Sequence, residues 1–212
     1  MPEDYRKTTY ESEFGDISAK KVDLVAEIMQ EHPGQRDMHN LVYKNDTKWK
    51  RKFMQVYNGK CAYCGVSLDI APQRYFEVDH FIYKEHPRFH NSKAEAGYMD
   101  NLVLACNMCN RSKSDIDLPD DTHVYLHPDK PGITDTFIRD EYFYIKLSEN
   151  KENDAKANEL YQSLKLDAEV HRLDYLLMSM KGLRRTISET SRIHAPLGNA
   201  IDLLQRKRNE FA

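Results

Sequence analysis

Four short stretches in the middle of the chain determine the fold that it can form. They are Cys61–Cys64 (CAYC), Glu77–His80 (EVDH), Cys106–Cys109 (CNMC) and Asn110–Lys113 (NRSK). The two Cys-x-x-Cys pairs contain all four cysteines of the chain, and in a reducing compartment this pattern favours a metal site over disulfides. Between and after the pairs lie a carboxylate, an imidazole and a carboxamide, so the segment predicts a metal-bound module with polar side chains beside it.

We expect a structural Zn²⁺ to be bound by four thiolates, those of Cys61, Cys64, Cys106 and Cys109. Four thiolates complete a tetrahedral shell without a position for water, so this ion is not the catalyst. Its loss is expected to unfold the module. Disulfides and unliganded thiols are the alternatives. The 41 residues between the two pairs exceed the spacing of an ordinary zinc ribbon, which favours a finger with a substrate-facing loop.

Three polar side chains near the cysteines suit phosphodiester hydrolysis, which needs a base for water and a divalent cation. His80 suits the base, because its ordinary pKa lies nearest neutrality. Asp79 and Asn110 offer hard oxygen ligands to Mg²⁺ or Mn²⁺. Each residue has a structural alternative: Asp79 could cap a turn, His80 could be structural, and Asn110 could be a helix-terminus residue.

A family resemblance emerges from three segments: Val78–His80, Asp100–Cys106 and Cys109–Lys113. Together they resemble the HNH endonucleases, specifically those whose ββα-metal finger is held by a four-cysteine zinc site. The resemblance implies a metal-dependent nuclease that leaves a 3′-hydroxyl and a 5′-phosphate.

The same resemblance implies a role for individual residues. Asp79 and Asn110 would hold the catalytic cation, and His80 would be the general base. Asn101 would steady the loop that carries His80, although on its own it could simply begin a strand. Two residues on the helix after the second cysteine pair are expected to contact the substrate: Lys113 and Arg111.

The predicted fold class is α+β, with three segments along the chain. Residues 1–46 are expected to form an N-terminal helical extension, 47–115 the zinc-containing nuclease module, and 116–212 a mainly helical C-terminal region. Residues 1–16 are polar and expected to be poorly ordered. Ile17–His32 and Thr47–Tyr57 have helical apolar spacing, and the second is rich in lysine, which indicates either a solvated face or a phosphate contact.

Within and after the module, other segments have readable patterns. Lys84–Tyr98 is polar and predicted to be a loop or insertion, with His86 and His90 exposed. We expect β-strands in Thr122–His127, which contains His123 and His127, and in Phe137–Leu147. The predicted C-terminal helices are Ala155–Leu166, Ala168–Ser191, and an amphipathic one that begins at Pro196 and contains Ile201, Leu203 and Leu204.

Composition limits the partners. The net charge is only −3, so nucleic-acid binding must rely on local patches, a metal ion or a partner. DNA is the expected substrate, with RNA open. We expect a cytoplasmic protein, because no apolar run is long enough to span a membrane and no signal peptide begins the chain.

A looser resemblance concerns the C-terminal region. Leu126–Asp129, Tyr161–Leu166 and Arg172 look like the HNH subunits of bacterial antiphage systems, of the Septu type or linked to retrons, which work beside an ATPase. The sequence has no Walker loop, so ATP dependence would come from a partner. Two alternatives are a free-standing homing or phage-processing endonuclease, and an inert zinc adaptor. The oligomeric state and the recognition site are left open, and a homo-oligomer is one of the expected assemblies.

Overall fold

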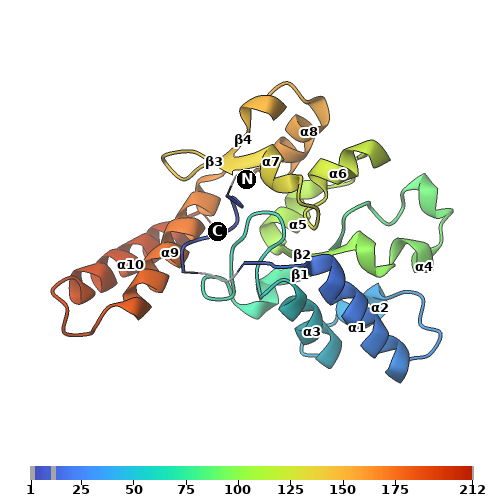
Figure 1. Cartoon of the computed structure of the whole chain (residues 1–212), viewed down its shortest axis with the longest axis horizontal. Helices are drawn as coiled ribbons and strands as arrows, with labels where there is room; N and C mark the ends of the chain where they lie inside the picture. The colour runs from blue at the N-terminus through green and yellow to red at the C-terminus, as the bar shows by residue number, and fades with distance from the viewer. Residues whose placement is uncertain (1–2, 11–12, 212) are drawn as a thin grey trace.

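The computed structural model describes residues 3–10 and 13–211. At its centre, β1 (Phe76–His80) and β2 (Leu102–Cys106) pair antiparallel, with Phe76 opposite Cys106 and His80 opposite Leu102. Helix α5 (Asn107–Lys113) follows β2 without a break and packs on both strands (Figure 1). Every residue of β2 is buried, as its apolar run predicts. The expected α+β fold with a ββα unit is confirmed.

Three helices precede this unit. They are α1 (Ile17–Glu31), α2 (His39–Val42) and α3 (Lys48–Val56), and α1 lies beside α3 (Figure 1). The hydroxyl oxygen of Thr47 accepts a hydrogen bond from the Lys50 backbone N–H, which caps α3 as its sequence predicts.

The N-terminal segment is more ordered than its polar composition suggests. Tyr5 and Arg6 are buried. The Tyr5 hydroxyl donates to the Tyr63 carbonyl at 2.5 Å, and Arg6 Nη1 donates to the Ala62 and Pro128 carbonyls at 2.7 and 2.8 Å. The expectation of disorder is therefore wrong for residues 3–10, because a buried guanidinium satisfies carbonyls from two distant segments. Residues 1–2 and 11–12 of the expected segment lie outside the described residues.

The basic face expected on α3 is largely neutralised or buried. Lys48 pairs with Glu31, and Lys52 pairs with Glu27, both acids of α1. Lys50 is fully buried. The basic residues of α3 are therefore divided between surface ion pairs with α1, one buried lysine and the exposed Arg51. A phosphate contact by this helix stays a prediction.

The predicted insertion is folded rather than an open loop. It contains a 3₁₀ turn, Pro87–Phe89, and helix α4 (Lys93–Ala96), with Phe89 and Ala96 buried. His90 is exposed, as predicted.

The C-terminal region differs from its prediction at two places. Thr122–His127 is not a strand, because α6 (His123–Leu126) forms there after a 3₁₀ turn, Asp120–Thr122, and Thr122 Oγ1 donates to the Pro119 carbonyl at 2.6 Å. Helix α7 (Ile133–Thr136) follows. The second predicted strand region is confirmed as a hairpin of β3 (Phe137–Arg139) and β4 (Ile145–Leu147).

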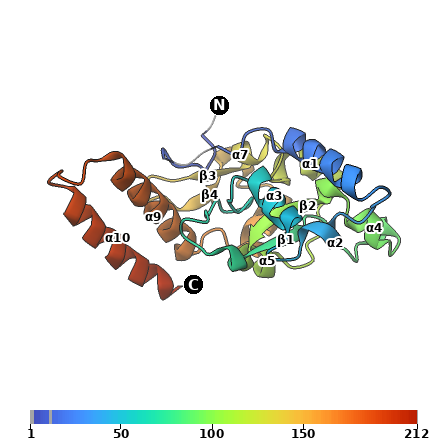
Figure 2. The same cartoon turned by 90° about the horizontal axis from the view of Figure 1, so that it is seen from below.

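The chain ends in three helices: α8 (Ala155–Ser163), α9 (Glu169–Thr186) and α10 (His194–Asn209). Helices α9 and α10 form an antiparallel pair that projects from the body (Figures 1 and 2). Ile201 is buried and Leu203 is exposed. Helix α10 begins at His194, before the predicted start at Pro196. In the described part of the chain, no helix has both the length and the apolar character that crossing a membrane requires.

Candidate active site

Four cysteine sulfurs form a compact cluster. Their ligand atoms all lie within 4.8 Å of one another, and all four side chains are buried. Sγ of Cys64 and Sγ of Cys106 are 3.8 Å apart, about the separation that a tetrahedron with Zn–S bonds of ~2.3 Å requires. The thiols are not disulfide-bonded. Four thiolates in this arrangement fit a zinc ion.

Local backbone geometry brings the two cysteine pairs together. The Ala62 N–H donates to the Leu104 carbonyl at 2.7 Å, which ties the first pair to β2. Gly65, directly after the first pair, has φ of +83°, and a Cβ there would lie 2.7 Å from the Arg6 backbone. Only glycine suits this tight turn. The second pair opens α5, where Cys106 caps the helix.

On β1, Asp79 is buried and holds two partners. The Tyr63 hydroxyl donates to Asp79 Oδ2 at 2.6 Å, and Lys113 Nζ donates to Oδ1 at 3.3 Å. Burial raises the pKa of the Asp79 carboxyl, and Lys113 and Tyr63 oppose that rise. Lys113 is itself buried and also donates to the His80 carbonyl at 2.9 Å. Its ammonium therefore lies against Asp79 rather than facing outward.

His80 follows Asp79 on β1, and its ring contacts a second imidazole in a tilted arrangement. The ring centroids of His80 and His39 are 4.5 Å apart. Burial, together with the nearby His39 and Lys113, lowers the pKa of His80 to about 3. The imidazole is therefore neutral at physiological pH and can accept a proton, but a pKa so far below the working pH makes it a weaker base than an ordinary histidine.

Asn110 and Asn101 occupy different positions. Asn110 Nδ2 donates to Glu77 Oε2 at 2.5 Å, which leaves its amide oxygen available for a ligand. Asn101 is buried and does not line the cavity that the other candidate residues share. Its Oδ1 accepts from the Ile82 N–H, and its Nδ2 donates to the Ile82 and Ala96 carbonyls, all at 2.8–3.0 Å. It thus holds the chain just after His80.

A cavity of about 300 Å³ brings most of the predicted residues together. Its lining includes His39, Asp79, His80, Asn110 and Lys113. The carboxylate of Asp79 and the amide oxygen of Asn110 are hard donors in one cavity, so they fit a divalent cation such as Mg²⁺ or Mn²⁺.

The other histidines and Arg111 lie away from this cavity. Arg111 is exposed and lines a different cavity, behind α5. His127 contacts the Asp100 carbonyl, and His123 contacts the Leu118 carbonyl. His86 lies 3.2 Å from Asp117.

Two residues of the site were not predicted from the sequence. Tyr63 lies inside the first cysteine pair, so its place in that motif is a local sequence signal for its position near the site. His39 lies 41 positions before His80 on a separate helix, and no local pattern marks it. Glu77 lies two residues before Asp79 on β1, and its carboxylate accepts the hydrogen bond from Asn110.

Comparison with known proteins agrees with this geometry. Residues 61–115 match the family model described as HNH endonuclease. No curated protein and no solved structure gives a significant match to the chain. The matched segment contains β1, β2, α5 and the four cysteines. The chain therefore contains an HNH endonuclease domain at residues 61–115, with its four cysteines clustered as a possible zinc site.

Proposed function

We propose that the protein is a metal-dependent endonuclease that hydrolyses phosphodiester bonds of DNA. The observation that carries this proposal is the convergence of Asp79, His80, Asn110 and Lys113 on one cavity beside the cysteine cluster. A zinc-bound knuckle pair would keep β1 and α5 in register, so that side chains from both elements meet without large rearrangement.

In this proposal each residue of the site has a separate role. His80 takes the proton of the attacking water, because its partly buried imidazole lines the cavity and is neutral at physiological pH. Asp79 and Asn110 hold the divalent cation, which supplies charge neutralisation at the phosphate and the leaving oxygen. Glu77 fixes the Asn110 amide through their hydrogen bond, and Asn101 fixes the backbone that follows His80. The cleaved strand carries a 3′-hydroxyl and a 5′-phosphate.

One substitution tests the proposal directly. Purified wild type and His80→Ala are incubated with plasmid DNA and with total RNA, in Mg²⁺ or Mn²⁺ and in EDTA. We expect wild type to cut DNA only with the cation, and His80→Ala to lose cutting while its zinc content and melting temperature are retained. His194→Ala, at the start of α10 and away from the cavity, is the matched control. Full cutting by His80→Ala would remove His80 from the mechanism.

The cellular role is proposed from the looser resemblance alone: a defence nuclease that works with a partner ATPase. Purified chain that cuts at full rate without ATP or any partner would contradict this part and favour a free-standing nuclease. If wild type and His80→Ala both fold, retain zinc and fail to cut, affinity purification from cells tests for the ATPase. If the protein does not cut nucleic acid even in the presence of all its cellular partners, the remaining alternative is a catalytically inert zinc adaptor.

A further inference from the structure

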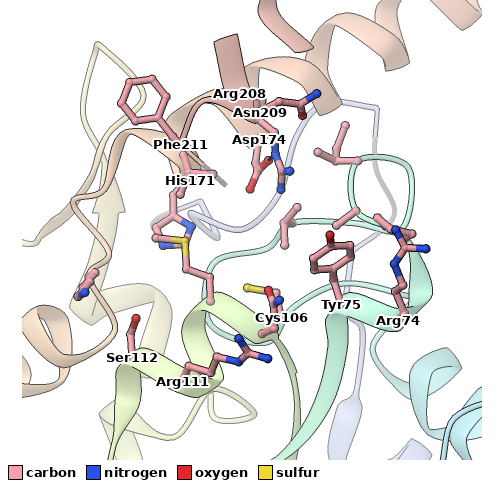
Figure 3. Close-up of a pocket in the computed structure, with 18 of the residues that line it drawn as sticks. Arg74, Tyr75, Cys106, Arg111, Ser112, His171, Asp174, Arg208, Asn209 and Phe211 are labelled. Atoms are coloured by element: carbon pink, nitrogen blue, oxygen red, sulfur yellow. Dashed lines mark hydrogen bonds and ion pairs between the residues drawn. The ribbon is translucent and has the colours of Figure 1, made fainter. Parts of the chain in front are cut away.

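A second and larger cavity lies behind α5. Its volume is about 670 Å³, within the range of small-molecule sites. Its walls come from the segment before β1, from α5, and from α9 and the end of α10 (Figure 3). Nothing in the proposed hydrolysis uses it.

The cavity carries an excess of positive charge. Arg74, Arg111 and Lys165 are exposed at its lining, and none of their side chains has a hydrogen bond or ion pair to any residue that the structure describes. The Arg74 guanidinium lies over the Tyr75 ring, 5.4 Å from its centroid. The acidic group of the lining, Asp174, is already paired with Arg208 at 2.8 Å. Three unpaired cations in a chain of net charge −3 point to an anionic ligand.

Deeper in the cavity, a histidine has no polar partner. His171 is 2% exposed, and neither ring nitrogen forms a hydrogen bond with the described residues. The Leu164 backbone lies beside the ring but outside hydrogen-bonding geometry. Figure 3 shows the side chain reaching from α9 toward α5. A neutral imidazole offers one donor and one acceptor, and leaving both buried and unused is costly.

The remaining lining suits a flat ring. Tyr75 and Phe211 contribute aromatic surface, and Val170 and Ile70 contribute apolar surface. Met108 lines the same space, and its unbranched side chain can move to uncover the imidazole. A planar ring with a polar edge and an attached anion matches these features together. A nucleotide has that chemistry.

Helix α5 relates this cavity to the active site. Asn110 and Lys113 line the smaller cavity, whereas Met108 and Arg111 line the larger one. At 3.6 residues per turn, the two pairs lie on opposite sides of the helix. A helix with its side chains is about 10 Å wide, and strand nucleotides are spaced about 3.4 Å apart along a duplex. A strand that passes around the helix from one cavity to the other therefore needs several nucleotides.

We propose that the larger cavity receives one unpaired nucleotide of the substrate strand, several positions from the cleaved phosphate. Its base lies against Tyr75 and the His171 imidazole, and its phosphate contacts Arg111 and Arg74. The proposal rests on the proposed function in that nucleic acid is the substrate. It adds that the protein selects strands with an unpaired nucleotide near the cut.

Binding without divalent cation separates this proposal from catalysis. The zinc-loaded full chain is titrated against three fluorescein-labelled DNA probes of one sequence: a paired duplex, a duplex with a one-nucleotide bulge, and a single strand. We expect wild type to bind the bulged and single-stranded probes about tenfold more tightly than the paired duplex. A tenfold difference in affinity is about what one additional buried hydrogen bond contributes. His171→Leu and Arg111→Ala should lose most of this preference.

Two controls keep the result interpretable. Lys130→Ala removes one charge from an exposed position outside the cavity and should keep the preference. Arg111 is exposed, so Arg111→Ala tests the proposal even if His171→Leu fails to fold. Equal affinity for all three probes, or a preference unchanged in both variants, would overturn the proposal. Tight binding of free dAMP without any strand preference would overturn it too and assign the cavity to a soluble nucleotide. Absent cutting with an intact preference would count against the nuclease proposal alone.

Discussion

Replacing Tyr63 with phenylalanine removes one hydroxyl from the active site. In the native protein that hydroxyl donates to buried Asp79 at 2.6 Å, and Tyr63 itself is 1% exposed. A hydrogen bond to a charged group contributes about 1.5–3 kcal/mol to stability. For a chain of this size, each kcal/mol shifts the melting temperature by about 2–4 °C. Tyr63→Phe should therefore melt about 3–12 °C below wild type.

The same change should alter catalysis in a specific direction. The Tyr63 hydroxyl is one of the groups that hold the pKa of Asp79 down against burial, so its removal raises that pKa further. Asp79 is a cation ligand only when ionised, and its ionised fraction falls as the pH drops through the pKa. The acidic limb of the pH–rate profile should therefore move to higher pH in Tyr63→Phe.

A matched variant separates stability from catalysis. The Tyr57 hydroxyl donates to Asp129 at 2.9 Å, away from the active site, and Tyr57 is fully buried. Tyr57→Phe should lower the melting temperature by a similar amount and leave the pH–rate profile in place. Calorimetry and plasmid cleavage between pH 5 and 9 measure both effects. If Tyr63→Phe shows the wild-type acidic limb, the reasoning that Tyr63 tunes Asp79 is refuted.

Two further predictions concern the metal centre and a buried lysine. Cys109→Ser should lose its zinc and its cooperative melting transition, because structural zinc contributes about 10–16 kcal/mol against a typical total stability of about 5–15 kcal/mol. Metal analysis and circular dichroism measure the zinc content and the melting transition. A zinc-free variant that melts like wild type would contradict this prediction. Burial lowers the pKa of Lys50 from 10.5 to about 8, with Glu77 opposing. The folded state therefore loses this proton at lower pH than the unfolded state, so wild type should gain about 3 kcal/mol relative to Lys50→Met as the pH rises from 8 to 10.5. Urea unfolding across that range measures the difference, and parallel curves for the two proteins would count against it.

Much of the nuclease module was readable from local sequence. Each Cys-x-x-Cys pair, the strand Phe76–His80 and the helix Asn107–Lys113 are set by spacing over a few residues, because metal knuckles, strand alternation and helix capping depend on near neighbours. The ordered motifs then placed Asp79, His80 and Asn110 in one site before any contact was known.

Errors arose where contacts between distant segments override local composition, and in one place where a local turn overrides β-propensity. The polar composition of residues 3–10 predicts poor order, yet Arg6 is buried and donates hydrogen bonds to the carbonyls of Ala62 and Pro128. Lys50 belongs by sequence to a basic helix face, yet it is fully buried and has Glu77 of β1 as a nearby charge. Thr122–His127 contains β-forming residues, but local turn hydrogen bonds made it helical, since β-propensity yields readily to context.

The sequence by itself determined the zinc-type cysteine set, the ββα order and the identity of the catalytic candidates, because all of these are encoded in local spacing and residue chemistry. Only the tertiary structure decided the surroundings of those candidates. It brought His39 against His80, Tyr63 and Lys113 onto Asp79, and Glu77 onto Asn110. It also closed a basic cavity between α5 and the C-terminal helices. These features depend on which distant side chains share a buried space, and packing of the whole chain, rather than any short pattern, sets that choice.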